Sequence, residues 1–168
     1  MEIVIIVAAT ENNAIGKDNR LLWRLPDDMK FFKEKTEGHC VITGRRNYES
    51  IPEKFRPLPG RTNVVVTRQT DYAAPGAIVV GSLEAGINVA RERGESICYI
   101  IGGGEIYLQA MDVADSIWLT RVYTVLDADT FFPELGGEWQ EVERIPHVAD
   151  EKHAYSFDFI RYEKQKAN

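Results

Sequence analysis

The chain has 168 residues, of which 44% are hydrophobic, and this predicts one globular domain over residues 1–168. No apolar run is long enough to cross a membrane, and a net charge of −6 argues against nonspecific nucleic-acid binding. The first residues lack the basic region of a secretory signal, and the two cysteines show no paired or metal-ligand spacing. We therefore expect a cytoplasmic protein with buried free thiols and with neither a membrane nor a nucleic acid as partner.

Hydrophobic periodicity predicts an α/β fold with a largely parallel sheet. Continuous apolar runs predict buried strands at Ile3–Ala9, Cys40–Thr43, Asn63–Thr67, Ala77–Val80 and Ile97–Ile101. Helices are predicted between them at Pro26–Thr36, Arg45–Ser50, Leu83–Arg93 and Glu105–Met111. Two later segments, Trp118–Val122 and Tyr155–Phe159, alternate between apolar and polar residues, which favours an antiparallel C-terminal edge. The tail Lys164–Asn168 is expected to fray.

The connection from Thr10 to Leu25 is unusually long for a compact domain. It combines turn residues such as Asn13 with apolar residues such as Ile15 and Trp23. Long loops of this kind are often functional, and the apolar residues argue against disorder. Two interpretations remain open: a lid over a substrate, or a loop pinned to the core.

The start of the first predicted helix carries two carboxylates. Pro26 suits the first helical turn, and Asp27 and Asp28 would interact well with the helix dipole there. Asp28 also lies four residues before Phe32, so both share one helix face. A carboxylate on an apolar face needs a hydrogen-bonding partner. Asp28 therefore either only assists the helix start or binds a ligand, whereas Asp27 is expected to face water.

Glycines and arginines gather at strand-to-helix junctions. Gly102, Gly103 and Gly104 follow an apolar strand, so they form either a tight turn or a backbone that a ligand approaches closely. Arg45 and Arg46 occupy the first turn of a helix, where cations are unfavourable unless an anion binds. Thr67 and Arg68 follow the next strand. Because open α/β sheets bind ligands at the carboxyl ends of their strands, these residues indicate an anion site.

Two further groups of residues carry less information. The proline-bounded loop Arg56–Arg61 is rigid, and Arg61 is either a surface charge or an anchor for a carboxylate. The histidines at 39, 147 and 153 show no ligand spacing, and we expect no metal.

The order and spacing of these segments resemble dihydrofolate reductase from about Ile3 to Glu163. The resemblance rests on Ala14-Ile15-Gly16, Trp23-x-Leu25-Pro26-x-Asp28, Gly44-Arg45, Pro57-Leu58-Pro59-Gly60-Arg61, Ile101-Gly102-Gly103-Gly104-x-Ile106-Tyr107 and Asp129-Thr130-Phe131-Phe132-Pro133. It implies a central eight-stranded, mostly parallel sheet with about four flanking helices. It also implies a monomeric, NADPH-dependent oxidoreductase that reduces 7,8-dihydrofolate to 5,6,7,8-tetrahydrofolate. Hydride would pass from nicotinamide C4 to pterin C6 while N5 is protonated, and the product would serve one-carbon metabolism, including thymidylate and purine synthesis.

The resemblance also implies roles for single residues. Asp28 would bind the pterin, Thr120 would support Asp28, Trp23 would hold a water, and Arg61 would pair with the α-carboxylate of the glutamate tail. The other substrate-binding residues would be Ile6, Ala8, Met29, Phe32, Ile51, Leu58, Ile101 and Tyr107. The cofactor would contact Ala8, Ile15, Gly16, Asn19, Gly44, Arg45, Arg46, Asn47, Thr67, Arg68, Gly103, Gly104, Glu105 and Ile106. Within that set, Arg45, Arg46, Thr67 and Arg68 would surround the 2′-phosphate and favour NADPH over NADH.

Two rival functions stay open. A reductase of riboflavin synthesis with the same fold would not need the Leu25-Pro26-x-Asp28 arrangement or Arg61. A noncatalytic NADPH-binding module would have no reason to keep Asp28 and Trp23.

Overall fold

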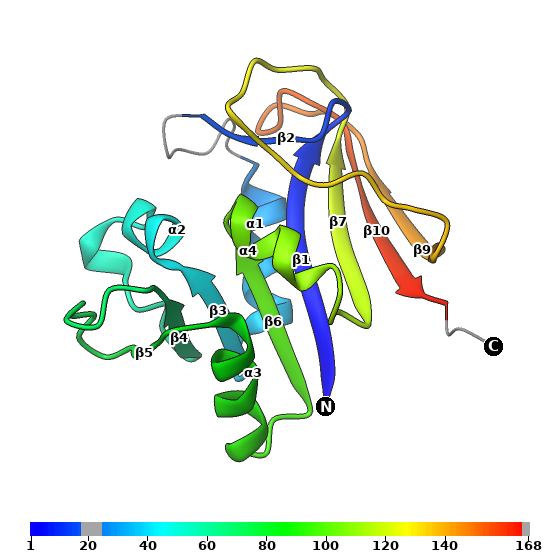
Figure 1. Cartoon of the computed structure of the whole chain (residues 1–168). Coiled ribbons are helices and arrows are strands. Elements are labelled where there is room, and N and C mark those ends of the chain that lie inside the picture. Colours follow the sequence, from blue (N-terminus) through cyan, green and yellow to red (C-terminus); the bar gives the residue numbers. More distant parts are fainter. Residues whose placement is uncertain (18–24, 166–168) are drawn as a thin grey trace.

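An eight-stranded sheet forms the centre of the computed structural model, which describes residues 1–17 and 25–165 (Figure 1). The strand order is β5-β4-β3-β6-β1-β7-β10-β9. The strands are β1 (Glu2–Thr10), β3 (Cys40–Gly44), β4 (Thr62–Val66), β5 (Ile78–Val80), β6 (Ile97–Gly102), β7 (Ser116–Val122), β9 (Trp139–His147) and β10 (Phe157–Lys164). Neighbours from β5 to β7 pair in parallel, whereas β10 pairs antiparallel with both β7 and β9. The expected mostly parallel sheet with an antiparallel C-terminal edge is confirmed.

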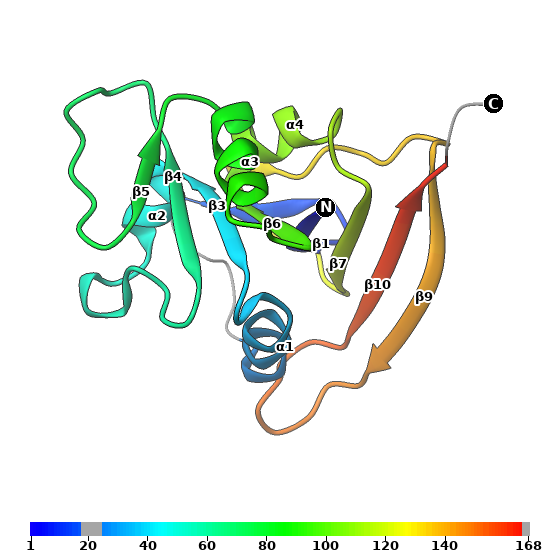
Figure 2. The same cartoon turned by 90° about the horizontal axis from the view of Figure 1, so that it is seen from below.

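Helices cover both faces of this sheet. They are α1 (Pro26–Thr36), α2 (Arg45–Ser50), α3 (Leu83–Glu92) and α4 (Gly104–Ala110), and a short 3-10 helix, η1, spans Glu53–Phe55. Figure 2 shows α1 on one face, with α3 and α4 on the other. A small second sheet pairs β2 (Ala14–Gly16) with β8 (Thr130–Phe131). Among the described residues, no helix is both long and apolar enough to cross a membrane.

The double cover explains the unbroken apolar run of β1. Successive strand residues point to opposite faces, so Ile5 and Val7 join the cluster under α3 and α4. Val4 and Ile6 join the second cluster, which packs against Phe31 of α1. Because both faces are buried, an alternating pattern would leave polar groups in one core.

Helix α1 begins and ends where the sequence predicts. Pro26 stands in its first turn, with Asp27 and Asp28 beside it, and Lys33 and Lys35 lie in the last turn. This charge order matches the helix dipole, with carboxylates at the positive end and ammonium groups at the negative end.

Several element boundaries differ from the sequence prediction. Strand β10 begins two residues later than expected and extends to Lys164, so Lys164 does not belong to a frayed tail. Its ammonium donates to the carbonyl of Met111 at 2.8 Å and lies 5.2 Å from the ring centroid of Trp139. Residues 166–168 lie outside the described part of the chain. Strand β9 was not predicted, because most of its side chains are exposed and several are charged, so the segment lacks a buried apolar pattern.

Candidate active site

A cleft of about 1300 Å³ opens at the carboxyl ends of the parallel strands. It is lined by the ends of β1, β3, β4 and β6 and by the first residues of α1, α2 and α4. This is the edge at which open α/β sheets bind ligands. The sequence-predicted residues that line it are Ala8, Ile15, Gly16, Asp28, Met29, Gly44, Arg45, Arg46, Asn47, Thr67, Arg68, Ile101, Gly103, Gly104, Glu105, Ile106 and Tyr107.

Asp28 contributes a carboxylate to this cleft from the first turn of α1. Its backbone N–H donates to the carbonyl of Leu25, which closes the helix start without using the side chain. The hydroxyl of Thr120, on β7, donates to Asp28 Oδ1 at 2.7 Å. Burial raises the pKa of Asp28 to about 6, while the hydrogen bond from Thr120 opposes that rise. The carboxylate is therefore free to accept hydrogen bonds from a ligand and to titrate near neutral pH.

Tyr107 is buried and lines the same cleft as Asp28. Its hydroxyl is within hydrogen-bond distance of two carbonyls, 2.8 Å from Ile6 and 2.9 Å from Ile101. Burial, together with the charge of Asp28, raises the pKa of this phenol. Because the single phenolic proton faces backbone acceptors on β1 and β6, the hydroxyl fixes the spacing of these two strands.

The three glycines at the start of α4 differ in the reason why each position lacks a side chain. Gly102 has φ +107°, and a Cβ there would lie 2.8 Å from the ring of Tyr107. A Cβ on Gly104 would lie 2.7 Å from Thr130 Cγ2. At Gly103 the nearest atom would be Asn47 Cβ at 3.8 Å, and Gly103 lines the cleft. The tight turn therefore accounts for Gly102, close packing against Thr130 accounts for Gly104, and Gly103 leaves room for a ligand to approach the backbone.

Arginines gather at the other end of the cleft. Arg45 pairs with Glu49 at 3.6 Å, whereas Arg46 and Arg68 are exposed and have no ion-pair partner within residues 1–17 and 25–165. The amide of Asn47 donates to Thr43 Oγ1 and to the carbonyl of Ile101, which ties the start of α2 to β3 and β6. The two unpaired guanidinium groups make this end of the cleft suited to an anion.

The first part of the Thr10–Leu25 connection is pinned to the core. Asn13 has φ +61°, and its carbonyl accepts from the backbone N–H of Phe132 at 2.8 Å. Arg121 donates to the carbonyl of Thr10 and to Asn13 Oδ1. Ile15 and Gly16 then reach the cleft. Residues 18–24, and with them the predicted roles of Asn19 and Trp23, lie outside the described residues.

Five predicted substrate residues lie off the cleft lining. Phe32 and Leu58 pack against the hydrophobic cluster under α1, Ile6 belongs to that cluster, and Ile51 packs beside Tyr48. Arg61 donates to Thr36 Oγ1 at 3.1 Å and to the carbonyl of Pro59 at 2.9 Å. Its guanidinium lies 5.9 Å from the ring centroid of Phe32, so Arg61 is held beside the C-terminal part of α1.

The cleft lining also includes residues to which the sequence analysis gave no role. They are Val7, Leu25, Ser50, Val66, Gly81, Ser82, Gln109, Asp129 and Thr130. Gly81 and Ser82 follow β5, so the rule that ligands bind at strand carboxyl ends could have found them. Asp129 and Thr130 stand in a quoted motif, but neither had a specific role.

Comparisons with known proteins extend over almost the whole chain. The family model described as dihydrofolate reductase matches residues 2–164. Dihydrofolate reductase type 3 of Salmonella typhimurium is 44% identical over 167 residues, covering 99% of this chain and 100% of that protein. The dihydrofolate reductase of Haemophilus influenzae is 44% identical over 161 residues, or 95% and 97% of the two chains. A solved dihydrofolate reductase from Enterococcus faecalis, complexed with NADP(H) and RAB-propyl, superposes with a TM-score of 0.90 at 36% identity, covering 98% and 97%.

Proposed function

Because the chain belongs to the dihydrofolate reductase family, we propose that its cleft binds NADPH and 7,8-dihydrofolate and that the protein reduces the latter to 5,6,7,8-tetrahydrofolate. One observation supports this proposal above the others. A carboxylate with a pKa of about 6, held by Thr120, lines a large cleft at the strand ends. A pterin presents hydrogen-bond donors of the kind that such a carboxylate accepts.

The residues of the cleft suit NADPH. Arg46 and Arg68, with Arg45 and Thr67 beside them, offer guanidinium and hydroxyl donors to the 2′-phosphate. Gly103 leaves space for the close approach of the pyrophosphate to the backbone. When bound, NADPH supplies the hydride that pterin C6 receives.

The opposite end of the cleft suits the pterin. Asp28 accepts hydrogen bonds from the amidine edge, and Met29 and Ile101 provide apolar surface beside it. Arg61, held near Thr36, pairs with the α-carboxylate of the glutamate tail. In this proposal Ile6, Phe32, Ile51, Leu58 and Tyr107 shape the surrounding walls, and Trp23 holds the ordered water.

Asp28 acts on the reaction through its charge. Its carboxylate stabilises the pterin when N5 is protonated, while water delivers the proton. Thr120 keeps the carboxylate oriented from β7 and opposes the rise in its pKa. Ile15 and Gly16 line the cleft, and in this proposal they and Asn19 contact the cofactor.

Steady-state oxidation of NADPH, measured with and without 7,8-dihydrofolate, tests the proposal. We expect fast oxidation only when dihydrofolate is present. Tight NADPH binding without turnover would instead favour the noncatalytic module, and turnover of a pyrimidine substrate alone would favour a reductase of riboflavin synthesis. We also propose that the chain acts as a cytoplasmic monomer, which light scattering of the purified protein and fractionation of cells would test.

A further inference from the structure

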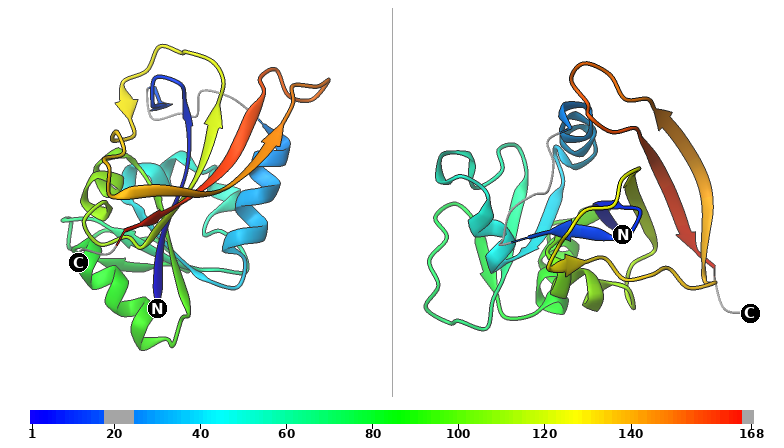
Figure 3. Two further views of the ribbon diagram at one scale, coloured as in Figure 1. Left: turned by 90° about the vertical axis from the view of Figure 1, so that its right-hand side faces the viewer. Right: turned by 90° about the horizontal axis from the view of Figure 1, so that it is seen from above.

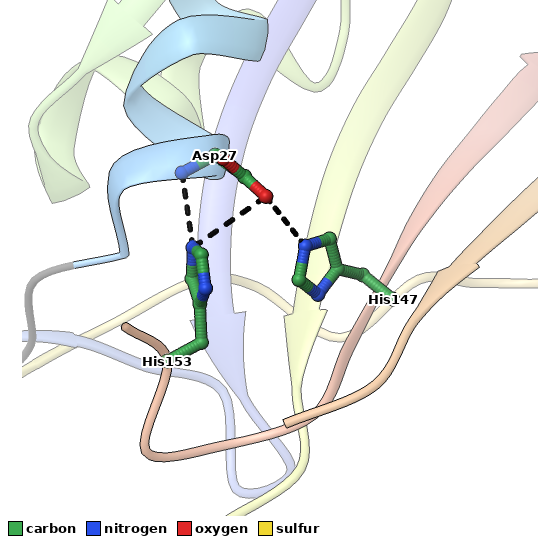
Figure 4. Close-up of side chains that lie close together, drawn as sticks. All are labelled: Asp27, His147 and His153. Atoms are coloured by element: carbon green, nitrogen blue, oxygen red, sulfur yellow. Dashed lines mark hydrogen bonds and ion pairs between the residues drawn. The ribbon is translucent and has the colours of Figure 1, made fainter. Parts of the chain in front are cut away.

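Three side chains from distant parts of the sequence converge outside the cleft (Figure 4). Asp27 lies at the start of α1, His147 ends β9, and His153 lies in the connection from β9 to β10, which passes beside α1 (Figure 3). His147 Nε2 is 2.6 Å from Asp27 Oδ2, and His153 Nε2 is 3.8 Å from the same oxygen. The three ligand atoms all lie within 4.8 Å of one another.

The outer nitrogens of both rings are already engaged. His153 Nδ1 lies 2.7 Å from Asp150 Oδ1, and His147 Nδ1 lies 2.8 Å from the carbonyl of Val148. Metal-binding histidines typically donate this second N–H to a carboxylate or a backbone carbonyl, which fixes the tautomer and leaves the other nitrogen for the ion. Both rings turn Nε2 toward Asp27, and His153 Nε2 also accepts the backbone N–H of Asp27 at 3.1 Å (Figure 4). A bound ion would therefore replace this hydrogen bond as well as the contact between His147 and the carboxylate.

Packing holds the two rings in place. His147 stacks on Phe157 at a centroid distance of 4.3 Å and an interplanar angle of 12°. The side chain of His153 is 1% exposed, whereas that of Asp27 is 49% exposed. The expectation that Asp27 faces water thus describes only part of its surroundings. The rings are positioned by the fold, and the carboxylate keeps the site open to an ion from solution.

We propose that Asp27, His147 and His153 bind one divalent transition-metal ion, with Zn²⁺ as the best match. Imidazole and carboxylate ligands suit Zn²⁺ or Ni²⁺, whereas Mg²⁺ and Ca²⁺ require oxygen ligands. Ligand atoms around tetrahedral zinc lie about 3.3–3.6 Å apart, given bonds of ~2.0–2.2 Å. The 2.6 Å contact must open by about 0.8 Å, which the exposed side chain of Asp27 can supply. The spacing between the two ring nitrogens, at most 4.8 Å, must close by up to about 1.3 Å, which requires a small shift of the rings. Water completes the fourth position.

The proposed metal site is separate from the cleft, although the two sites use neighbouring residues of the sequence. Asp27 precedes Asp28, yet it is not among the residues that line the cleft. A bound ion would join the start of α1 to the connection between β9 and β10. Sequence spacing could not reveal this arrangement, because 120 residues separate Asp27 from His147.

The chain has other residues of the types that bind zinc, and one of them provides a matched control. Cys40 and Cys98 are 0% exposed, so an ion in solution cannot reach either thiol while the protein is folded. His39 lies elsewhere and contacts Glu95 at 3.4 Å. The variant His39→Gln therefore removes one histidine of comparable partial burial and leaves the proposed site intact.

The experiment is a calorimetric titration of Zn²⁺ into the full chain, free of any affinity tag and first treated with a chelator. We expect one ion per chain, and we expect His39→Gln to bind like the wild type. His147→Gln and Asp27→Asn should each weaken binding by more than about tenfold, and Asp150→Asn, which alters the carboxylate beside His153 Nδ1, by about 10–100-fold. Co²⁺ should give visible absorption bands of a four-coordinate ion in the wild type and not in His147→Gln. Circular dichroism of each variant verifies folding.

Three results would overturn the proposal. The wild type could fail to bind Zn²⁺, in which case the cluster only pairs α1 with the neighbouring connection. Affinity could be equal in the wild type, His147→Gln and Asp27→Asn, which would place an adventitious ion elsewhere. Mg²⁺ could compete as well as Ni²⁺, which would reduce the site to a nonspecific carboxylate.

Discussion

At Asp28, burial and a hydrogen bond act on one carboxyl group in opposite directions. Burial dominates and raises the pKa to about 6, although the hydroxyl of Thr120 stabilises the charged form. The carboxylate is therefore mostly charged at pH 7 but can bind a proton at little cost. A bound cation beside it would lower the pKa again, so a protonated pterin and a charged Asp28 favour each other.

Replacing this carboxylate by an amide should impair the reaction. We expect Asp28→Asn to lower kcat/KM for dihydrofolate by about two to four orders of magnitude at neutral pH, the range for residues that assist proton transfer. The amide keeps the shape of the side chain but removes its charge. Steady-state kinetics measure the effect, and near-normal turnover would contradict the proposed mechanism.

The same substitution should stabilise the ligand-free fold above pH 6. The folded pKa of Asp28 is about 6 and the unfolded pKa about 3.9, so the folded state binds the proton more tightly. The favourable contribution of the protonated carboxyl group to folding is complete below pH ~4 and is lost as the pH rises through about 6. At pH 7–8, Asp28→Asn should therefore unfold at a higher urea concentration, with a gain of about 1–3 kcal/mol that disappears near pH 4.

Urea unfolding at several pH values measures this difference. Asp71→Asn, at an exposed position, serves as the control. A stability difference between Asp28→Asn and the wild type that does not change with pH would show that burial of the charge is not its cause.

At the scale of elements, the junction between β6 and α4 depends on Gly102. Its φ of +107° disfavours any side chain, and a Cβ would meet the buried ring of Tyr107 at 2.8 Å. That ring cannot move freely, because its hydroxyl contacts the carbonyls of Ile6 and Ile101. We expect Gly102→Ala to lower the free energy of unfolding by about 2–4 kcal/mol, from overpacking and backbone strain together.

Urea unfolding of the ligand-free protein tests this expectation. Gly137→Ala is the matched control, because a Cβ at Gly137 would have no atom within 4 Å. Equal stability of Gly102→Ala and Gly137→Ala would mean that Tyr107 can yield, and that the junction is less constrained than its contacts indicate.

The ends of β3 and β4 bring Arg46 and Arg68 into one cleft. We expect Arg46→Ala and Arg68→Ala each to weaken NADPH binding by about 10–100-fold, the value of a charge-assisted hydrogen bond. Binding of NADH, which lacks the 2′-phosphate, should stay nearly unchanged. Fluorescence titration with both cofactors measures the contrast, and Arg93→Ala, exposed and outside the cleft lining, is the control. Equal losses for both cofactors would mean that the arginines do not contact the 2′-phosphate.

For the whole molecule, the sequence predicts buried elements better than exposed ones. The run in β1 is apolar because two cores need it, so its pattern is easy to recognise. Strand β9 is exposed along most of its length, on both faces, so it lacks the apolar pattern by which a strand is recognised. The order of the strands needs contacts that no local pattern contains.

Some residues of the candidate site could likewise be predicted from the sequence, and others could not. Gly44 and Arg45 follow from their place at a strand end, because the rule about parallel sheets is general. The contact between Asp28 and Thr120 joins residues 92 positions apart, so only resemblance to a family could predict it. The cluster of Asp27 with two histidines had neither a local signal nor a family precedent in the sequence analysis.

The charge of the whole molecule and the charge of the cleft predict opposite salt effects on NADPH association. A net charge of −6 would repel an anionic cofactor, and added salt would then speed association. The Debye length is only about 10 Å at 0.1 M ionic strength, so the nearby Arg45, Arg46 and Arg68 should outweigh distant carboxylates. We therefore expect the association rate constant, measured by stopped-flow fluorescence, to fall as salt is added. In the double variant Arg46→Ala and Arg68→Ala this fall should flatten or reverse, and a rate that rises with salt in the wild type would show that net charge governs the approach.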